Sequence, residues 1–301
     1  MLNLTALRER FGDKAQENTI LAPYTSARIG GPADLMVTVT SADELADAVQ
    51  ICWRDSIPYS LFGGGSNILV SDKGLRGVAL LNRAKAVEFR PGPKPVLWAE
   101  SGVVFSNLAN RTAAKGFSGL EWAATVPGTL GGAIYGNAGA FGGDMARDLL
   151  RAEVLTDAGR AWWPADSFGY GYRTSVLKRG ELRAVVLAAE IKLKNAPADE
   201  IKTTIDQFVA RRKATQPPGA SMGSMFKNPP GDYAGRLIEA AGLKGARIGS
   251  VQISPIHGNF FVNDGETRAS DVLALIKLAQ DAVLQKFGVQ LELEVELLGE
   301  W

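Results

Sequence analysis

Two glycine-rich segments constrain the fold of this chain more than any other feature of its sequence. The first is Phe62-Gly-Gly-Gly-Ser-Asn-Ile68, and the second spans 125–143. Glycine supplies 34 of the 301 residues, above the usual level of roughly 7%, and the excess is concentrated in these two places. Because glycine lacks a Cβ, such segments let the backbone turn sharply or approach another molecule closely. Their clustering without a fixed period argues against a fibrous protein or a linker.

The first glycine-rich segment lies between strands predicted at 58–62 and 68–71. Its successive N–H groups can converge on an anion, and Ser66 and Asn67 add side-chain donors. The segment leads into a strand rather than a helix, and no Lys-Ser or Lys-Thr pair follows it. It is therefore neither a P-loop nor a Rossmann fingerprint. Taken alone, it is equally typical of a tight turn between strands.

The second segment is too long and too poor in large side chains to be a simple turn. Small residues throughout predict a main chain that lies against a large flat or extended ligand, with Thr129 and Asn137 offering polar contacts. The two segments together match the needs of a dinucleotide, with one loop for its phosphates and one wall for its ring. The residues alone therefore favour a dinucleotide held by backbone contacts.

Hydrophobic periodicity predicts an α+β chain. Strands are expected at 35–39, 58–62, 68–71, 78–82, 86–90, 96–100, 152–156, 160–163, 183–193, 257–263 and 291–297. Helices are expected after a capping box at Ser41 and Glu44, from Phe105 to Gly116, from Pro197 to the basic run 211–213, from a cap at Asp232 to Gly242, and over 272–283. We expect a hinge at 216–219 and a domain boundary near residue 196. This boundary separates a cofactor-binding part, residues 1–195, from a smaller α+β substrate-binding part, residues 196–301. The core of the cofactor-binding part is expected at about 30–194.

Composition narrows the function classes. With 33 basic and 32 acidic residues the net charge is +1, so no overall field favours nucleic acid or an anionic membrane as partner. One cysteine, Cys52, and one histidine, His257, cannot form a disulfide or a Cys/His zinc site, and no metal is expected. We expect Cys52 to be buried. The N-terminal residues lack a signal-peptide pattern and no apolar run is long enough to span a membrane, so we expect a cytoplasmic protein. We also expect a monomer.

Specific motifs add a family resemblance. GGGSN followed by PGTLGGAIYGNAGAFGG resembles the FAD-binding domain of the vanillyl-alcohol-oxidase (PCMH) type, which implies two subdomains. More closely, the chain resembles the UDP-N-acetylenolpyruvoylglucosamine reductases of peptidoglycan precursor synthesis, from Tyr24-Thr-Ser-Ala-Arg-Ile-Gly-Gly-Pro-Ala-Asp34 to the C-terminal strand. GYRTS at 171–175, GSMFKNP at 223–229 and EVELLGE at 294–300 are specific in combination. The short span between Arg173 and Ser224 is similar to the shorter second type of this family.

The resemblance implies non-covalent FAD and NADPH as co-substrate. FAD accepts a hydride from NADPH and passes one to UDP-GlcNAc-enolpyruvate, giving UDP-N-acetylmuramate. The cofactor-binding residues that it implies are Gly63, Gly64, Gly65, Ser66, Asn67, Thr125, Pro127, Gly128, Thr129, Gly132, Asn137 and Gly139.

The resemblance also implies the catalytic set. Arg173 faces the substrate carboxylate, for which a guanidinium is a planar, permanently charged partner. Ser224 is the proton donor and Glu294 the catalytic carboxylate, while Lys227 and Asn228 contact substrate. The sequence departs from the family near Glu294, where proline often replaces Leu293 and a basic residue often replaces Glu296.

Two other functions stay open on the residues. One is a FAD-dependent oxidase of a sugar or alcohol on the same cofactor fold, although His257 and Cys52 are poorly placed to tether a flavin. The other is a nucleotide-sugar-binding protein without redox chemistry. We expect His257, at the start of the strand predicted over 257–263, to be structural rather than catalytic.

Overall fold

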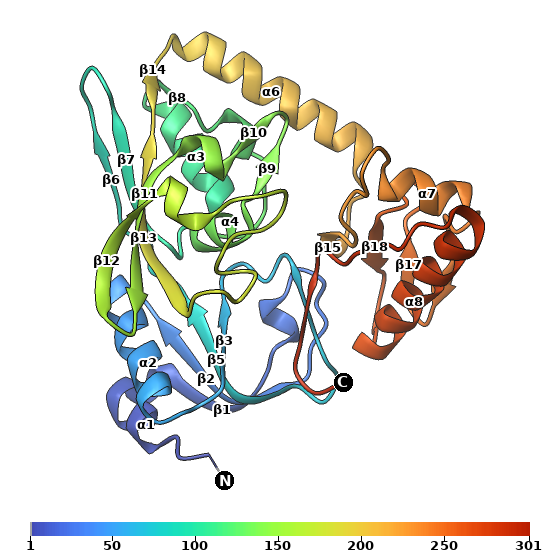
Figure 1. Cartoon of the computed structure of the whole chain (residues 1–301), viewed down its shortest axis with the longest axis horizontal. Coiled ribbons are helices and arrows are strands. Elements are labelled where there is room, and N and C mark those ends of the chain that lie inside the picture. Colours follow the sequence, from blue (N-terminus) through green and yellow to red (C-terminus); the bar gives the residue numbers. More distant parts are fainter. Residues whose placement is uncertain (1) are drawn as a thin grey trace. The chain divides into compact units, whose positions relative to one another are not determined.

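The computed structural model describes residues 2–301, which form two compact units (Figure 1). Unit 1 comprises Met1–Ala15, Val37–Gly63 and Leu80–Arg212, and unit 2 comprises Gln16–Met36, Gly64–Ala79 and Lys213–Trp301. The chain passes from unit 2 to unit 1 within β2 (Pro32–Val39) and again within β5 (Leu75–Asn82). A four-stranded sheet has the order β1-β2-β5-β3, with β1 at Ala15–Ile20 and β3 at Tyr59–Phe62.

Unit 1 is built on a five-stranded antiparallel sheet of order β12-β11-β13-β7-β6. Its strands are β6 (Val87–Arg90), β7 (Val96–Glu100), β11 (Leu149–Thr156), β12 (Gly159–Pro164) and β13 (Ala184–Lys192). The helix α4 (Leu130–Gly136) packs against β13 and β7, and α2 (Ala42–Arg54) packs against β13. The central strand β13 is apolar along almost its whole length because helices cover it, and it lies in the unit's main core.

The other elements of unit 1 are short, apart from one long helix. They are α1 (Thr5–Phe11), α3 (Phe105–Ala114), α5 (Met145–Asp148), α6 (Ala198–Thr215), β8 (Phe117–Ser118), β9 (Gly139–Ala140), β10 (Gly143–Asp144), β14 (Lys194–Asn195) and the 3-10 turns Gly12–Lys14, Glu121–Ala123 and Ala165–Phe168. Helix α6 packs on the core of unit 1 through Ile201, Ile205 and Phe208. Its last three residues belong to unit 2.

Unit 2 contains a four-stranded antiparallel sheet of order β15-β18-β17-β16, with two helices (Figure 1). Its elements are β4 (Ile68–Val70), β15 (Ala220–Ser224), β16 (Arg247–Ile248), β17 (Val251–Ile253), β18 (Phe260–Asn263), β19 (Glu296–Leu298), α7 (Ala234–Ala240), α8 (Ala269–Phe287) and a 3-10 turn at Ala22–Tyr24. The last strand, β19, pairs in parallel with β4, the strand that follows the first glycine-rich loop. A second hydrophobic core lies beneath α8 and joins it to this sheet.

The expected α+β class and nearly all expected strands are confirmed, with differences at four places. The capping box holds one half as predicted, since Ser41 Oγ accepts the Glu44 N–H, but the Glu44 carboxylate accepts the N–H of Thr40 instead of that of Ser41. The cap predicted at Asp232 is wrong, because the N-cap residue is Tyr233 and the Asp232 carboxylate binds the Tyr233 N–H and Arg236.

Two strand predictions are too long. His257 lies in a turn before β18, because its carbonyl accepts the Phe260 N–H. The strictly alternating strand predicted over 291–297 is limited to Glu296–Leu298. The chain before it forms one isolated bridge, between Leu293 and Phe226, instead of a continuous ladder. Alternation of side chains therefore overestimated the length of regular pairing.

Candidate functional site

The two glycine-rich segments meet in unit 1, at Gly63 and Thr129. A Cβ placed on Gly63 would lie 2.2 Å from Thr129 Oγ1. Only glycine therefore lets the first loop approach the second this closely. Nearby, the Arg83 guanidinium donates to the Gly63 carbonyl oxygen at 2.8 Å and fixes the loop from the other side. The predicted Gly63 and Thr129 are thus brought together, and Arg83 is a neighbour that the sequence did not single out.

The second segment is more regular than predicted. Thr129 is the N-cap residue of α4, and the β9–β10 hairpin follows that helix. The segment expected to form a wall for the ring thus consists of a helix and a hairpin. Asn137 ends the helix in a left-handed conformation with φ +46°. Its buried side chain donates to the Gly171 carbonyl oxygen at 2.9 Å and accepts the Ala146 N–H at 3.0 Å. Asn137 thereby joins this segment to the loop that carries Arg173.

Arg173 is anchored on the hairpin that follows α4. Its Nη2 donates to the carbonyl oxygen of Gly139 at 2.8 Å, and its guanidinium lies over the Tyr172 ring. The backbone of Arg173 adopts φ +56°, a conformation that is uncommon for a residue with a side chain. On the same loop Ser175 Oγ donates to the Tyr135 carbonyl oxygen at 2.6 Å. The structure therefore places the predicted Arg173 beside the predicted Gly139.

Arg212, near the end of α6, is a cation that sequence reasoning assigned only to a helix end. Its Nη1 lies 3.4 Å from Thr125 Oγ1, and burial lowers the pKa of the guanidinium. Within residues 2–301 no carboxylate forms an ion pair with it. A partly buried, uncompensated cation on a predicted cofactor-binding residue fits an anionic ligand. The signal in the sequence was the position of Arg212 within the run 211–213, which reads equally well as a solvated helix end.

In unit 2 the rest of the first loop contacts the final strand region. Asn67 Nδ2 donates to the carbonyl oxygen of Glu294 at 3.0 Å. Gly65 has φ +61°, and a Cβ there would lie 2.2 Å from the Tyr24 carbonyl oxygen, so this position requires glycine. The Gly65 carbonyl oxygen accepts the Ser26 N–H at 2.9 Å. The 24–34 motif and the GGGSN motif thus support each other.

Ser224 and Glu294 lie on adjacent segments of unit 2. The Glu294 N–H donates to the carbonyl oxygen of Met225 at 2.9 Å, and Ser224 pairs with Phe260 in the sheet. Both Ser224 and Glu294 are half-buried. Across the part of the chain that the structure describes, the Ser224 hydroxyl makes no hydrogen bond, which leaves it available to a ligand.

The two predicted substrate contacts are engaged within unit 2. Lys227 forms an ion pair with Glu292. Asn228 Oδ1 accepts the Ala234 N–H at 3.1 Å and so supplies the helix cap that had been expected from Asp232. The amide N–H₂ of Asn228 stays available, because this cap uses only its oxygen.

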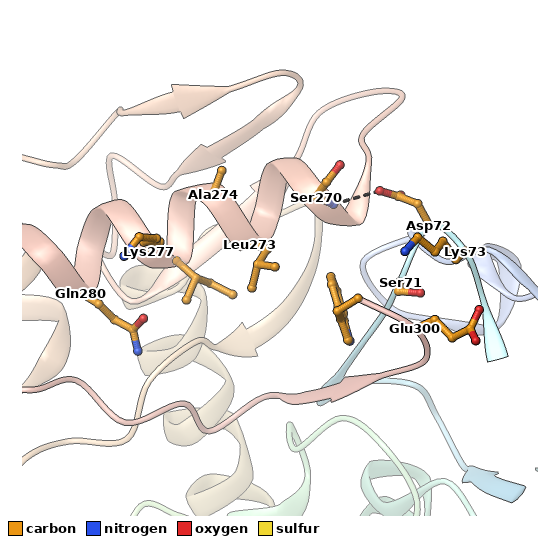
Figure 2. Close-up of a pocket in the computed structure, with 11 residues that line it drawn as sticks. Ser71, Asp72, Lys73, Ser270, Leu273, Ala274, Lys277, Gln280 and Glu300 are labelled. Atoms are coloured by element: carbon orange, nitrogen blue, oxygen red, sulfur yellow. Dashed lines mark hydrogen bonds between the residues drawn. The ribbon is translucent and has the colours of Figure 1, made fainter. Parts of the chain in front are cut away.

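A separate cavity of about 600 Å³ opens in unit 2 and contains none of the predicted site residues (Figure 2). Its lining comes from the turn 71–73, from α8 and from Glu300 and Trp301. Figure 2 shows Asp72 reaching the first turn of α8, where its carboxylate accepts the N–H groups of Ala269 and Ser270. The carboxylate therefore serves as a cap for α8.

Three further expectations concern single residues and absences. Cys52 is buried as predicted, and burial raises the pKa of its thiol to about 12. Over residues 2–301 no cluster of three or more His, Cys, Asp or Glu side chains could hold a metal ion. The same stretch contains no helix with the length and apolar character required to cross a membrane.

Comparison with known proteins gives two family matches. Residues 33–163 match the FAD binding domain, and residues 214–298 match the C-terminal domain of UDP-N-acetylenolpyruvoylglucosamine reductase. The FAD match includes Gly63 and Thr129, and the second match includes Ser224 and Glu294. Arg173 and Arg212 lie between the two matched regions.

Individual relatives match nearly the whole chain. A UDP-N-acetylenolpyruvoylglucosamine reductase of Chloroflexus aggregans is 43% identical over 97% of this chain and 100% of its own length. A UDP-N-acetylenolpyruvoylglucosamine reductase of Rubrobacter xylanophilus is 40% identical over 97% of this chain and 98% of its own length. The crystal structure of the enzyme from Thermus caldophilus is 36% identical, with a TM-score of 0.81 over 93% of this chain and 97% of that chain.

Proposed function

This chain belongs to the UDP-N-acetylenolpyruvoylglucosamine reductase family, and on that premise we propose that it reduces UDP-GlcNAc-enolpyruvate to UDP-N-acetylmuramate with FAD and NADPH. The observation that carries the proposal is the arrangement in unit 2. Within residues 2–301 the Ser224 hydroxyl makes no hydrogen bond. The next residue, Met225, accepts the Glu294 N–H through its carbonyl oxygen, and the Glu294 carbonyl oxygen accepts a hydrogen bond from Asn67 of the first glycine-rich loop. These contacts support a direct connection between the proposed cofactor loop and the proposed proton-transfer pair.

The residues of both glycine-rich segments fit a bound FAD. In unit 1 the contact between Gly63 and Thr129 leaves room for backbone but for no Cβ, and the Arg212 guanidinium can pair with a phosphate. The remaining residues of the second segment that would hold FAD also lie in unit 1: Thr125, Pro127, Gly128, Gly132, Asn137 and Gly139. Those of the first loop lie in unit 2: Gly64, Gly65, Ser66 and Asn67. FAD, when bound, supplies the hydride-transfer chemistry.

The polar residues would then stabilise the negative charge that develops on the substrate and supply a proton. Hydride addition to a double bond conjugated to a carboxylate places negative charge on the carbon beside that carboxylate. The Arg173 guanidinium would bind the carboxylate and stabilise this charge, and Ser224 would deliver a proton to the same carbon. Glu294 would orient the substrate or polarise the Ser224 proton through water. Lys227 and the amide of Asn228 would bind the remaining polar groups of the substrate.

The finer assignments belong to the same proposal. We place FAD mainly on 1–195 and the substrate mainly on 196–301. The protein acts as a monomer in the cytoplasm, where NADPH is the reductant. Leu293 and Glu296, which depart from the usual family residues, adjoin Glu294 without replacing it.

A half-reaction assay on purified holoenzyme tests the function. NADPH should bleach the flavin absorbance, and UDP-GlcNAc-enolpyruvate should restore it without oxygen, while simple alcohols should not. Colourless protein that binds no FAD would support a binding protein without redox chemistry. Reduction of the flavin by an alcohol or sugar would support an oxidase instead.

A further inference from the structure

The only histidine of the chain lies next to the segment that carries Ser224. His257 Nδ1 accepts the backbone N–H of Asn259 at 3.2 Å. An imidazole nitrogen that accepts a hydrogen bond carries no proton, so the neutral ring holds its proton on Nε2. A Cβ on Gly235 would lie 2.9 Å from His257 Cε1, so α7 packs closely on the ring and limits its rotation. The edge of the ring also contacts Phe260.

Asn259 is almost completely buried, with 3% of its surface exposed, and is bonded to the segment after Ser224 on three sides. Its Oδ1 accepts the Phe226 N–H at 2.9 Å, and its Nδ2 donates to the Phe226 carbonyl oxygen at 2.8 Å. Its own carbonyl oxygen accepts the Met225 N–H at 2.8 Å. The Asn259 side chain therefore pairs with both backbone groups of Phe226, as a residue of a neighbouring strand would.

These bonds continue to the proposed proton-transfer pair. The carbonyl oxygen of Met225 accepts the N–H of Glu294, so the residue that Asn259 binds also fixes the backbone of Glu294. Ser224 is the next residue before Met225, and it pairs with Phe260, the next residue after Asn259. The relative position of the two groups thus depends on the backbone of Asn259.

We propose that Asn259 is a positioning residue for Ser224 and Glu294, and that it depends on the unprotonated Nδ1 of His257. The inference rests on the proposed function of Ser224 and Glu294. Protonation turns Nδ1 from a hydrogen-bond acceptor into a donor. Two donors, the Nδ1–H and the Asn259 N–H, then face and repel each other. Acidic pH should therefore loosen the Ser224 segment and slow protonation of the substrate while leaving flavin reduction by NADPH intact.

The surroundings of His257 set the pH at which its ring becomes protonated. Burial lowers the pKa of the imidazole, and the positive charge of Lys244 lowers it further, while Glu239 acts in the opposite direction. Lys244 and Glu239 form an ion pair at 2.8 Å, so their effects on the ring partly cancel. The neutral ring is therefore the form present at neutral pH, and the transition lies below the ordinary histidine value of about 6.5.

Two substitutions distinguish the hydrogen bond that His257 accepts from the protonation of its ring. In His257→Asn the amide Oδ1 occupies nearly the place of Nδ1 and can accept the Asn259 N–H without titrating. In His257→Gln the polar group lies where Nε2 was, so the acceptor is lost. We expect the rate of flavin reoxidation by UDP-GlcNAc-enolpyruvate to fall at acidic pH in wild type, to lose this acid limb in H257N, and to be about three- to tenfold lower at neutral pH in H257Q.

Amide hydrogen exchange of the peptide that covers 222–229 provides a readout without substrate. Exchange should accelerate in H257Q and remain at the wild-type rate in H257N. Equal reoxidation rates in wild type and H257Q, an acid limb that persists in H257N, or an equal loss of both half-reactions would overturn the inference. If wild type is not reoxidised at all, the proposed function fails, and the exchange data alone then decide whether His257 and Asn259 hold this segment.

Discussion

The Asn67 side-chain amide donates to the backbone carbonyl oxygen of Glu294 at 3.0 Å, across 227 positions of sequence. This bond links the first glycine-rich loop to the segment that ends the C-terminal part. Immediately after it, the N–H of Glu296 donates to the Asn67 carbonyl oxygen, and the parallel pairing of β19 with β4 begins. The geometry of the loop and that of Glu294 are therefore set together.

Asn67→Asp should damage both features. The substitution replaces a donor with an acceptor that faces a carbonyl oxygen, and leaving that contact unmade costs about 1–3 kcal/mol. We expect a lower melting temperature of the apoprotein together with weaker FAD binding, measured by thermal unfolding and by flavin fluorescence titration. Ser66→Ala, at the neighbouring position, serves as the control for unfolding. An unchanged melting temperature in N67D would show that the bond to Glu294 contributes nothing to folding.

Gly63→Ala should separate the two glycine-rich segments. The new Cβ would meet Thr129 Oγ1 at 2.2 Å, so the loop must move, and overpacking of this kind costs about 1–3 kcal/mol. Thr129→Ala removes the opposing atoms, so the double variant should recover most of the lost apoprotein stability. Stability costs that simply add in the double variant would mean that the two positions do not clash. Thermal unfolding of wild type, the two single variants and the double variant measures the coupling free energy between the two positions.

The sequence predicted much of this fold because hydrophobic alternation and glycine or proline breaks marked the strands of both units. It missed α4, since Leu130–Gly136 contains three glycines, and glycine is a poor helix former. The helix forms because its apolar residues Leu130, Ala133 and Ile134 pack in the core of unit 1. Thr129 contributes only its backbone carbonyl oxygen, which accepts the Ala133 N–H, and its side chain does not cap the helix. Local propensity was overridden by tertiary packing.

For the site, sequence reasoning named Ser224 and Glu294 through family motifs, but their spacing alone said nothing about their proximity. The connection between them runs through Met225, whose backbone bonds no motif reveals. Asn259 and Arg212 were missed for the same reason, because only contacts between segments far apart in the chain draw attention to them. Contacts of this kind require the folded structure.

Arg212→Met should weaken binding of FAD more than binding of riboflavin. Among the described residues, 2–301, the partly buried guanidinium has no carboxylate partner. A charge-assisted hydrogen bond to phosphate is worth about 1.5–3 kcal/mol, or about ten- to hundredfold in affinity. Riboflavin carries no phosphate, so its affinity should not change. Lys213→Met removes the same charge from the next, exposed position and should bind FAD like wild type. Equal losses for FAD and riboflavin would instead assign Arg212 a structural role at Thr125.

Ser224→Ala should separate the two half-reactions. We expect flavin reduction by NADPH to stay near the wild-type rate, and reoxidation by UDP-GlcNAc-enolpyruvate to slow by about 10²–10⁴-fold, the usual contribution of a general acid. Arg173→Lys should also slow the second half-reaction, because a point charge cannot reproduce a bidentate fork. Stopped-flow absorbance measures each step. Wild-type reoxidation in S224A would remove the serine from the role of proton donor.

Asp72 gives a prediction about the pH dependence of stability. Burial tends to raise the pKa of its carboxyl, but hydrogen bonds from Ala269 and Ser270 outweigh this and hold the pKa below its usual value of 3.8. The cap therefore stabilises the folded state fully above about pH 4, and the contribution is lost as pH falls through the lowered pKa. Asp72→Ala should cost about 1 kcal/mol at pH 7. The difference from wild type in chemical denaturation should shrink below pH 4, and a constant difference would argue against the cap.

The left-handed backbone of Arg173 has a consequence for how such an enzyme can change over generations. A residue with a side chain is disfavoured at φ +56°, whereas glycine or asparagine is comfortable there. A library selected only for survival of heat should accordingly become enriched in glycine and asparagine at position 173, and those survivors should have lost turnover. On the proposed role of Arg173, catalysis and thermal robustness therefore place opposite demands on this one residue.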